Sequence, residues 1–179
     1  MSPLLAWRSP VYIVACFAGV IGLGLLLLQP LLIGGYLPGL PKQITRRAHP
    51  CVGVMLVVAV IIHIIGLWTT SPPDVIDALT FSSPTPFSNW GVVAMWSLFA
   101  TMALAIFRRR LQLRARNWRM AHSLLALVIV IGTVVHAILI EGVMETVSKV
   151  TLCVLVVIAT MKLIFSSKFF SNLRFSSKR

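Results

Sequence analysis

Five long stretches of this sequence are apolar and nearly free of charged residues. A helix needs about 20 such residues to cross the hydrocarbon core of a bilayer. The stretches that qualify lie at about 11–36, 50–70, 88–107, 120–140 and 147–166. The last is the weakest, because Lys149 and Lys162 flank its uncharged core and must extend to the two interfaces. The sequence therefore predicts an all-α membrane protein, a bundle of five transmembrane helices.

The composition also favours a membrane protein. Of the 179 residues, 58% are hydrophobic and only 11% are charged, whereas about a quarter of the residues in a soluble domain are charged. A net charge of +12 could suggest a nucleic-acid partner, but the basic residues lie between apolar stretches and not on one soluble face. We therefore expect a single membrane domain at 1–179, with a basic cytoplasmic tail at 167–179. Its expected partner is the lipid bilayer and not a nucleic acid.

The first apolar stretch is longer than a signal peptide requires. No charge occurs from Ser9 to Pro41 and no A-x-A cleavage pattern follows, so we expect a spanning helix. Pro30 with Gly34-Gly35 is expected to break or tilt it. The three cysteines lie far apart, which indicates neither a disulfide framework nor a C-x-x-C metal site. They are predicted to be small buried hydrophobes: Cys16, Cys51 and Cys153.

Loop charges predict the orientation of the chain. Basic residues gather between spans one and two, between spans three and four, and after span five: Lys42, Arg46, Arg47, Arg108, Arg109, Arg110, Arg114, Arg116, Arg119, Lys162, Lys168, Arg174, Lys178 and Arg179. The four acids fall on the other side: Asp74, Asp77, Glu141 and Glu145. Because cytoplasmic loops are enriched in lysine and arginine, the N-terminus should lie outside and the C-terminus inside. Only Arg8 and Lys149 disagree. The outer loop at 71–87 is expected to be polar and rich in turns.

The only histidines form two equally spaced pairs, His49 with His63 and His122 with His136. Ionisable side chains within membrane spans are costly and by default indicate a functional site. Fourteen helical residues leave a net rotation of about 40° and a rise of about 21 Å, so both members of a pair lie on nearly one face. One metal ion cannot use both, because metal–nitrogen bonds are about 2 Å long.

Each histidine therefore needs a partner at its own depth on another helix. Spans two and four run in the same direction, which pairs His49 with His122 at the inner edge and His63 with His136 further out. Four small residues lie near these faces and leave room for a flat macrocycle: Gly53, Ala59, Ala126 and Gly132. The alternative is that they serve helix packing, because small residues are common at membrane helix contacts.

Haem is the preferred occupant of the two sites. Imidazole is an axial ligand of haem iron, whereas zinc needs four ligands and no Cys, Asp or Glu lies at these depths. The sequence has no C-x-x-C-H motif for covalent attachment. The alternative for each histidine is a hydrogen bond between helices. Four arginines lie near the inner histidines: Arg46, Arg47, Arg116 and Arg119. They either pair with haem propionates, for which Arg47 and Arg119 are the candidates, or only set the topology of the chain. Trp118 either packs on the inner haem edge or anchors the interface.

Two segments carry a resemblance to a known family. The stretches R-R-A-H-P-C-V-G-V-M-L-V-V-A-V-I-I-H at 46–63 and R-N-W-R-M-A-H-S-L-L-A-L-V-I-V-I-G-T-V-V-H at 116–136 resemble the ferric-reductase-like transmembrane domain shared by ferric reductases and NADPH oxidases. The resemblance implies two non-covalent haem b groups, the inner one with axial ligands His49 and His122 and the outer one with His63 and His136. Many family members have six spans and continue into a flavin and NAD(P)H domain, whereas we expect five spans and no such domain in this chain.

The leading hypothesis from the sequence is an electron conduit in a bacterial inner membrane. A cytoplasmic donor, such as a flavoprotein docked on the arginine-rich segment at 108–119, would supply electrons to an outer acceptor: ferric iron, oxygen or a periplasmic redox protein. On this view the chain is the electron-transfer component of an oxidoreductase and not a complete enzyme. The alternatives are a non-catalytic haem subunit that exchanges electrons with quinone, and a haem-free transporter.

Overall fold

The computed structural model describes residues 8–165, and these residues form six helices and no strands. The helices are α1 (Pro10–Gly34), α2 (Lys42–Thr70), α3 (Pro72–Leu79), α4 (Pro86–Phe107), α5 (Ala115–Leu139) and α6 (Thr146–Phe165). All except α3 are long and apolar enough to cross a membrane. The predicted bundle of five spans is therefore confirmed, while the predicted tail at 167–179 lies outside the described residues.

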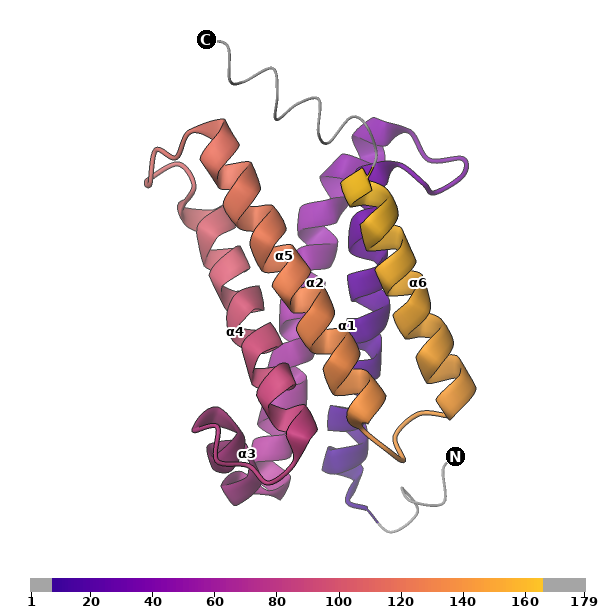
Figure 1. The fold of residues 1–179 in the computed structure, drawn as a ribbon, viewed down its shortest axis with the longest axis vertical. Coiled ribbons are helices and arrows are strands. Elements are labelled where there is room, and N and C mark those ends of the chain that lie inside the picture. The colour runs from indigo at the N-terminus through magenta and orange to yellow at the C-terminus, as the bar shows by residue number, and fades with distance from the viewer. Residues whose placement is uncertain (1–7, 166–179) are drawn as a thin grey trace.

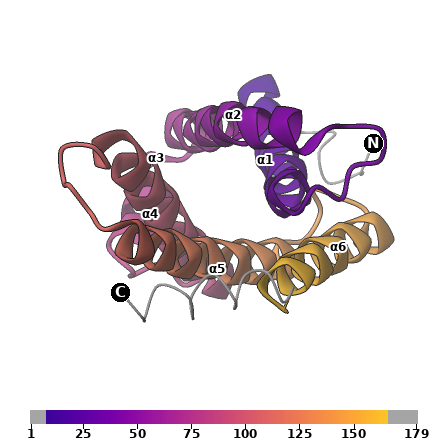
Figure 2. The ribbon, with the colours of Figure 1, turned by 90° about the horizontal axis from the view of Figure 1, so that it is seen from above.

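Two antiparallel hairpins build the bundle. Helix α1 packs along α2, α4 packs along α5, and α6 lies against α1 and α5 (Figure 1). Seen from above, α1 and α2 form one layer, and α4, α5 and α6 form an arc that faces it (Figure 2). Helices α2 and α5 run in the same direction, but their backbones approach each other at few points. Side chains therefore mediate most of the contact between the two hairpins.

Two helices begin earlier than the hydropathy predicted. Helix α2 begins at Lys42 and not near 50, and α5 begins at Ala115 and not near 120. Lysine and arginine favour helix, so the helices continue past the apolar stretch into the polar region. Pro50 lies inside α2, where its missing N–H removes one backbone hydrogen bond without ending the helix. The basic residues next to the inner histidines thus lie on helices and not in loops.

The segment at 71–87 contains a helix as well as turns. Helix α3 begins with two prolines, whose fixed φ suits the first helical turn. Asp74 also lies in that first turn, where a negative charge is favourable at the helix N-terminus. The segment returns to turn conformations at Phe81, with φ of 59°.

Helix α1 continues through Pro30 without a break and ends at Gly34. Gly35 follows with φ of 65°, which glycine adopts without a steric penalty. Its N–H donates to the Leu32 carbonyl and the N–H of Tyr36 donates to the Leu31 carbonyl, the hydrogen bonds of a Schellman cap. Of the residues expected to break or tilt this span, the two glycines therefore end it and Pro30 does not.

The interior of the bundle is a small cluster of aliphatic side chains from α1, α2, α4, α5 and α6: Leu23, Leu26, Leu56, Leu98, Ile129, Val130, Cys153 and Val156. Cys16 and Cys153 are buried as predicted, but the prediction is wrong for Cys51, which is exposed on α2. Many large apolar side chains are also exposed. In water such a surface would promote association, whereas on membrane-length helices it faces lipid.

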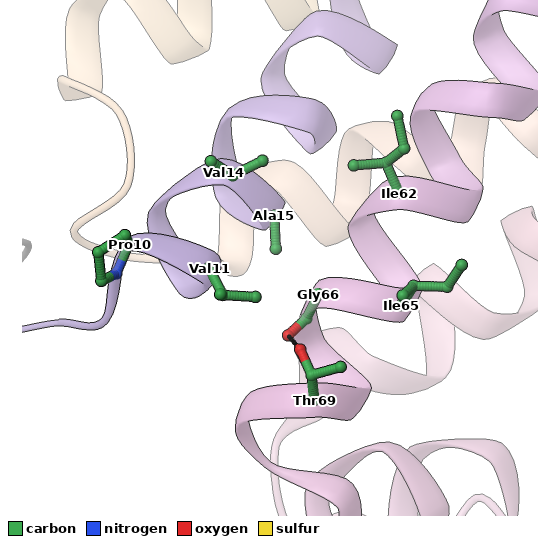
Figure 3. A pocket seen from close by; sticks show the side chains of 8 residues that line it. All are labelled: Pro10, Val11, Val14, Ala15, Ile62, Ile65, Gly66 and Thr69. Atoms are coloured by element: carbon green, nitrogen blue, oxygen red, sulfur yellow. Dashed lines mark hydrogen bonds between the residues drawn. The ribbon is translucent and has the colours of Figure 1, made fainter.

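Helices α1 and α2 approach closely near one end of the bundle. A Cβ atom added to Gly66 would lie 2.6 Å from the Cβ of Ala15, so only glycine fits there. An apolar groove lies beside this contact (Figure 3), and its one polar side chain, Thr69, donates to the Gly66 carbonyl. The groove is lined by Pro10, Val11, Val14, Ala15, Ile62, Ile65, Gly66 and Thr69. It offers apolar surface and no ligand for a metal.

The two basic residues that disagree with the orientation rule both have local partners. The ammonium group of Lys149 donates to the Ile138 and Ile140 carbonyls at 3.2 and 2.6 Å, so it caps the C-terminal end of α5. The guanidinium of Arg8 lies 5.0 Å from the centre of the Tyr12 ring. Both charges thus have a structural role on the side of the bundle that carries the acids.

Candidate functional site

The four histidines meet as two pairs across the bundle. The rings of His49 and His122 have centroids 6.1 Å apart and planes at 71°. The rings of His63 and His136 have centroids 6.5 Å apart and planes at 84°. Each pair takes one histidine from α2 and one from α5, so two similar constellations are stacked along the helix axes.

The outer pair is held by backbone carbonyls. Nδ1 of His63 lies 2.7 Å from the Ala15 carbonyl oxygen on α1, and Nδ1 of His136 lies 2.9 Å from the Phe87 carbonyl oxygen on α4. A carbonyl oxygen only accepts, so Nδ1 of each ring carries the hydrogen. In a neutral imidazole this leaves the lone pair on Nε2, the usual arrangement in a metal-binding histidine.

Two glycines let the neighbouring helices reach the outer histidines. A Cβ atom on Gly91 would lie 2.7 Å from Nδ1 of His136, and one on Gly19 would lie 3.1 Å from Nδ1 of His63. Each glycine follows its carbonyl residue, Phe87 or Ala15, by four positions, so the two lie on one face of their helix. Sequence reasoning missed both glycines, because nothing in the sequence marks the carbonyl residues that lie four positions before them.

The inner pair has no such support. Nδ1 of His49 and Nδ1 of His122 are both buried without a hydrogen-bond partner. His49 lies beside the Gln29 carbonyl of α1, but the geometry does not reach a hydrogen bond. Trp118 stacks on the His122 ring at 5.2 Å between centroids and 15° between planes. The guanidinium of Arg108 lies 4.3 Å from the centre of the Trp118 ring.

The other predicted site residues are placed less centrally. Trp118 lies on His122 itself. Gly132 packs on α4, because an added Cβ would lie 2.9 Å from the Trp90 carbonyl oxygen, and Gly53 faces Gln29 of α1. These two glycines therefore serve helix packing, the alternative that the sequence left open. The arginines near the inner pair are all exposed: Arg46, Arg47, Arg116 and Arg119.

The chemistry of the two pairs fits an axially ligated iron. If one metal ion bound a nitrogen of each ring, the two nitrogens would lie about 4 Å apart, because each metal–nitrogen bond is about 2 Å long. Each ring centre lies about 1 Å beyond its nitrogen, so the two centroids would be about 6 Å apart. Both observed separations agree with this value. Within residues 8–165 no group of three or more His, Cys, Asp or Glu side chains could hold a metal ion. Two nitrogens per site suit a haem, whose porphyrin provides the remaining ligands, and do not suit zinc.

Comparison with known proteins gives one match. Residues 15–133 match the family described as ferric reductase like transmembrane component, which is well over half of the chain. The chain belongs to this family. The matched range includes His49, His63 and His122 and ends just before His136. No curated protein and no solved structure matches the chain. With its five apolar helices, this ferric-reductase-like chain is an integral membrane protein.

Proposed function

We propose that this ferric-reductase-like protein holds two haem b groups and conducts electrons across a membrane. The observation that carries the proposal is the spacing of the rings within both histidine pairs, 6.1 and 6.5 Å between centroids. His49 and His122 are the proposed axial ligands of the inner haem, and His63 and His136 those of the outer haem. Each group, when bound, supplies reversible one-electron chemistry at iron.

Residues around the two pairs orient the proposed ligands. The Ala15 and Phe87 carbonyls hold the outer imidazoles in the tautomer that a metal requires. Trp118 holds the plane of His122 by stacking. Arg47 and Arg119 are exposed within one turn of the inner histidines and are the proposed contacts for haem propionates.

Charge gives the conduit a proposed direction. The α4–α5 connection and the first turns of α2 and α5, which carry most of the described basic residues, lie at the same end of the bundle. Helix α3 and the α5–α6 connection, which carry the acids, lie at the other end (Figure 1). By the positive-inside rule the basic end is cytoplasmic, which places the start of α1 outside and the end of α6 inside. An inside-negative membrane potential then favours outward electron movement by about 2.3 kcal/mol per 100 mV.

The proposed partners follow from this polarity. An electron donor of opposite charge, such as a flavoprotein, would dock on the exposed arginines at 108–119. The acceptor lies at the acidic end and is ferric iron, oxygen or a redox protein in the periplasm of a bacterium, with this chain in the inner membrane. The chain would then act as the electron-transfer component of an oxidoreductase.

Electron transfer into sealed vesicles tests the proposal. Purified protein is reconstituted in liposomes that contain ferricyanide, and a membrane-impermeant reductant is added outside. We expect ferricyanide to be reduced much faster than in protein-free liposomes, and His63→Ala and His122→Ala to return the rate to that background, since each removes one of two sites in series. Wild-type protein that contains haem but reduces no internal ferricyanide would contradict the proposal.

A further inference from the structure

The two histidine pairs differ in how their imidazoles are supported. Building on the proposed haem sites, we propose that the outer site holds its iron at a lower reduction potential than the inner site. The difference comes from the hydrogen bonds of the outer pair, from the Arg108–Trp118 stack on the inner pair, and from the charges at the two ends of the bundle. Each contribution acts in the same direction.

Hydrogen bonds make the outer imidazoles stronger electron donors. His63 and His136 each donate Nδ1–H to a backbone carbonyl, at 2.7 and 2.9 Å. Such a bond raises the basicity of the ligating nitrogen. A more basic ligand stabilises ferric iron relative to ferrous iron and so lowers the reduction potential. Because the acceptors are backbone atoms of α1 and α4, this effect is built into the packing of both hairpins.

The inner imidazoles lack this effect and face a positive charge. Neither His49 nor His122 makes a hydrogen bond at Nδ1, although the Gln29 carbonyl lies beside His49. On His122 lies the Trp118 ring, and on that ring lies the guanidinium of Arg108. A fixed positive charge stabilises the added electron of the ferrous state, and it does so over a longer range in a medium of low dielectric. Both features raise the inner potential.

The remaining charges reinforce the difference. The inner end carries a cluster of exposed cations on or beside α2 and α5: Arg46, Arg47, Arg109, Arg110, Arg114, Arg116 and Arg119. The outer end carries the described acids, Asp74, Asp77, Glu141 and Glu145, and its two cations are held by Tyr12 and by the α5 carbonyls. A positive end raises, and a negative end lowers, the potential of the nearer iron.

The ordering has a consequence for direction. Transfer of one electron outward oxidises the inner iron from ferrous to ferric and reduces the outer iron from ferric to ferrous. With the outer potential lower, this internal step is unfavourable without a membrane voltage, and an inside-negative voltage offsets it. An inside-negative voltage would therefore speed outward conduction between the donor and acceptor classes already proposed.

A redox titration of the purified, haem-loaded protein tests the ordering by absorption spectroscopy. We expect two one-electron components whose equilibrium constants differ at least tenfold, which is 59 mV. His136→Ala should retain only the component of higher potential, and His49→Ala only the lower. Two components of equal potential, or the reverse assignment in these variants, would overturn the inference.

Two further pairs of variants test the causes. Gly19→Ala places a Cβ 3.1 Å from Nδ1 of His63 and should raise the lower potential alone, whereas Gly24→Ala, which has no atom within 4 Å, should change neither. Arg108→Gln should lower the higher potential alone, and by more than Arg109→Gln does. Equal effects within either pair would overturn the assigned cause. Wild-type protein without haem would overturn the proposed function as well, whereas two haems of equal potential would overturn only this inference.

Discussion

His63 on α2 and His136 on α5 face each other with ring centroids 6.5 Å apart, and each ring hydrogen-bonds a backbone carbonyl of the other helix in its own hairpin. The hairpins α1–α2 and α4–α5 thus each present one oriented imidazole to the space between them. His49 and His122 repeat the arrangement one interval along the same helices, without the carbonyl support. The resulting asymmetry between two similar sites underlies the predictions below.

Replacing single histidines should remove one haem at a time. His63→Ala or His136→Ala should lose the outer haem and retain the inner one, so that haem content falls to about half, and His49→Ala or His122→Ala should do the converse. Pyridine haemochrome assays on purified variants measure this content. Added imidazole should restore haem to the alanine variants, because it replaces the missing ligand. Loss of all haem from every single variant would instead indicate collapse of the fold.

Gly91→Ala should disturb the outer site without a change in any ligand. The new Cβ would lie 2.7 Å from Nδ1 and 2.8 Å from Cε1 of His136, so the ring must leave the Phe87 carbonyl. We expect the outer haem to be lost or weakened and the inner haem to remain, as measured by haem content and absorption spectrum. Gly24→Ala on α1, in open space, is the control. Equal haem spectra in the two variants would contradict the close contact.

Close helix approaches should make two glycines necessary for stability. Alanine at Gly66 would bring its Cβ within 2.6 Å of the Ala15 Cβ, and alanine at Gly132 within 2.9 Å of the Trp90 carbonyl oxygen. Overpacking of this kind costs about 1–3 kcal/mol. Unfolding in detergent should show this loss in both variants, whereas Gly24→Ala should be neutral or slightly stabilising, because alanine favours helix. Unfolding that is identical in all three variants would argue against both contacts.

The start of α6 should depend on pH through Glu145. Its carboxylate accepts hydrogen bonds from the N–H groups of Ser148 and Val147, at 2.9 and 3.0 Å, and these bonds, with that from the Ser148 hydroxyl, lower the pKa of Glu145. A carboxyl group with a lowered folded pKa contributes stability above its unfolded pKa of about 4.3, and that stability is lost as the pH falls through the folded pKa.

Glu145→Ala should therefore lower the unfolding temperature slightly at neutral pH, and the difference from the wild type should disappear in acid. Thermal unfolding in detergent across this pH range is the measurement. Glu141→Ala removes another exposed acid from the same connection and is the control. A difference for Glu145→Ala that persists unchanged into acid would show that the hydrogen bonds to the ionised carboxylate are not its cause.

Much of the fold followed from the sequence, because bilayer thickness and backbone hydrogen bonding permit few solutions. Five apolar stretches of spanning length predicted five membrane helices, and the equal spacing of His49 to His63 and His122 to His136 predicted which rings meet. Helix ends were less predictable. Charged residues such as Lys42 and Arg116 extend a helix beyond the bilayer, where hydropathy no longer identifies it.

The surroundings of the site could not be predicted in the same way. The acceptors for His63 and His136 are backbone carbonyls, which every residue has, so nothing in the sequence marks Ala15 or Phe87. The Arg108–Trp118 contact depends on how the α4–α5 connection folds back on α5. Gly19 and Gly91 became interpretable only once the α1–α2 and α4–α5 pairings were known.

The amount of haem bound by purified wild-type protein tests the central proposal most directly. Protein extracted in mild detergent from cells supplied with haem is assayed for haem per chain, together with its oxidised and reduced absorption spectra. We expect two haem b groups per chain, with the low-spin spectra of iron ligated by two histidines. A folded, fully helical and colourless protein would contradict the account.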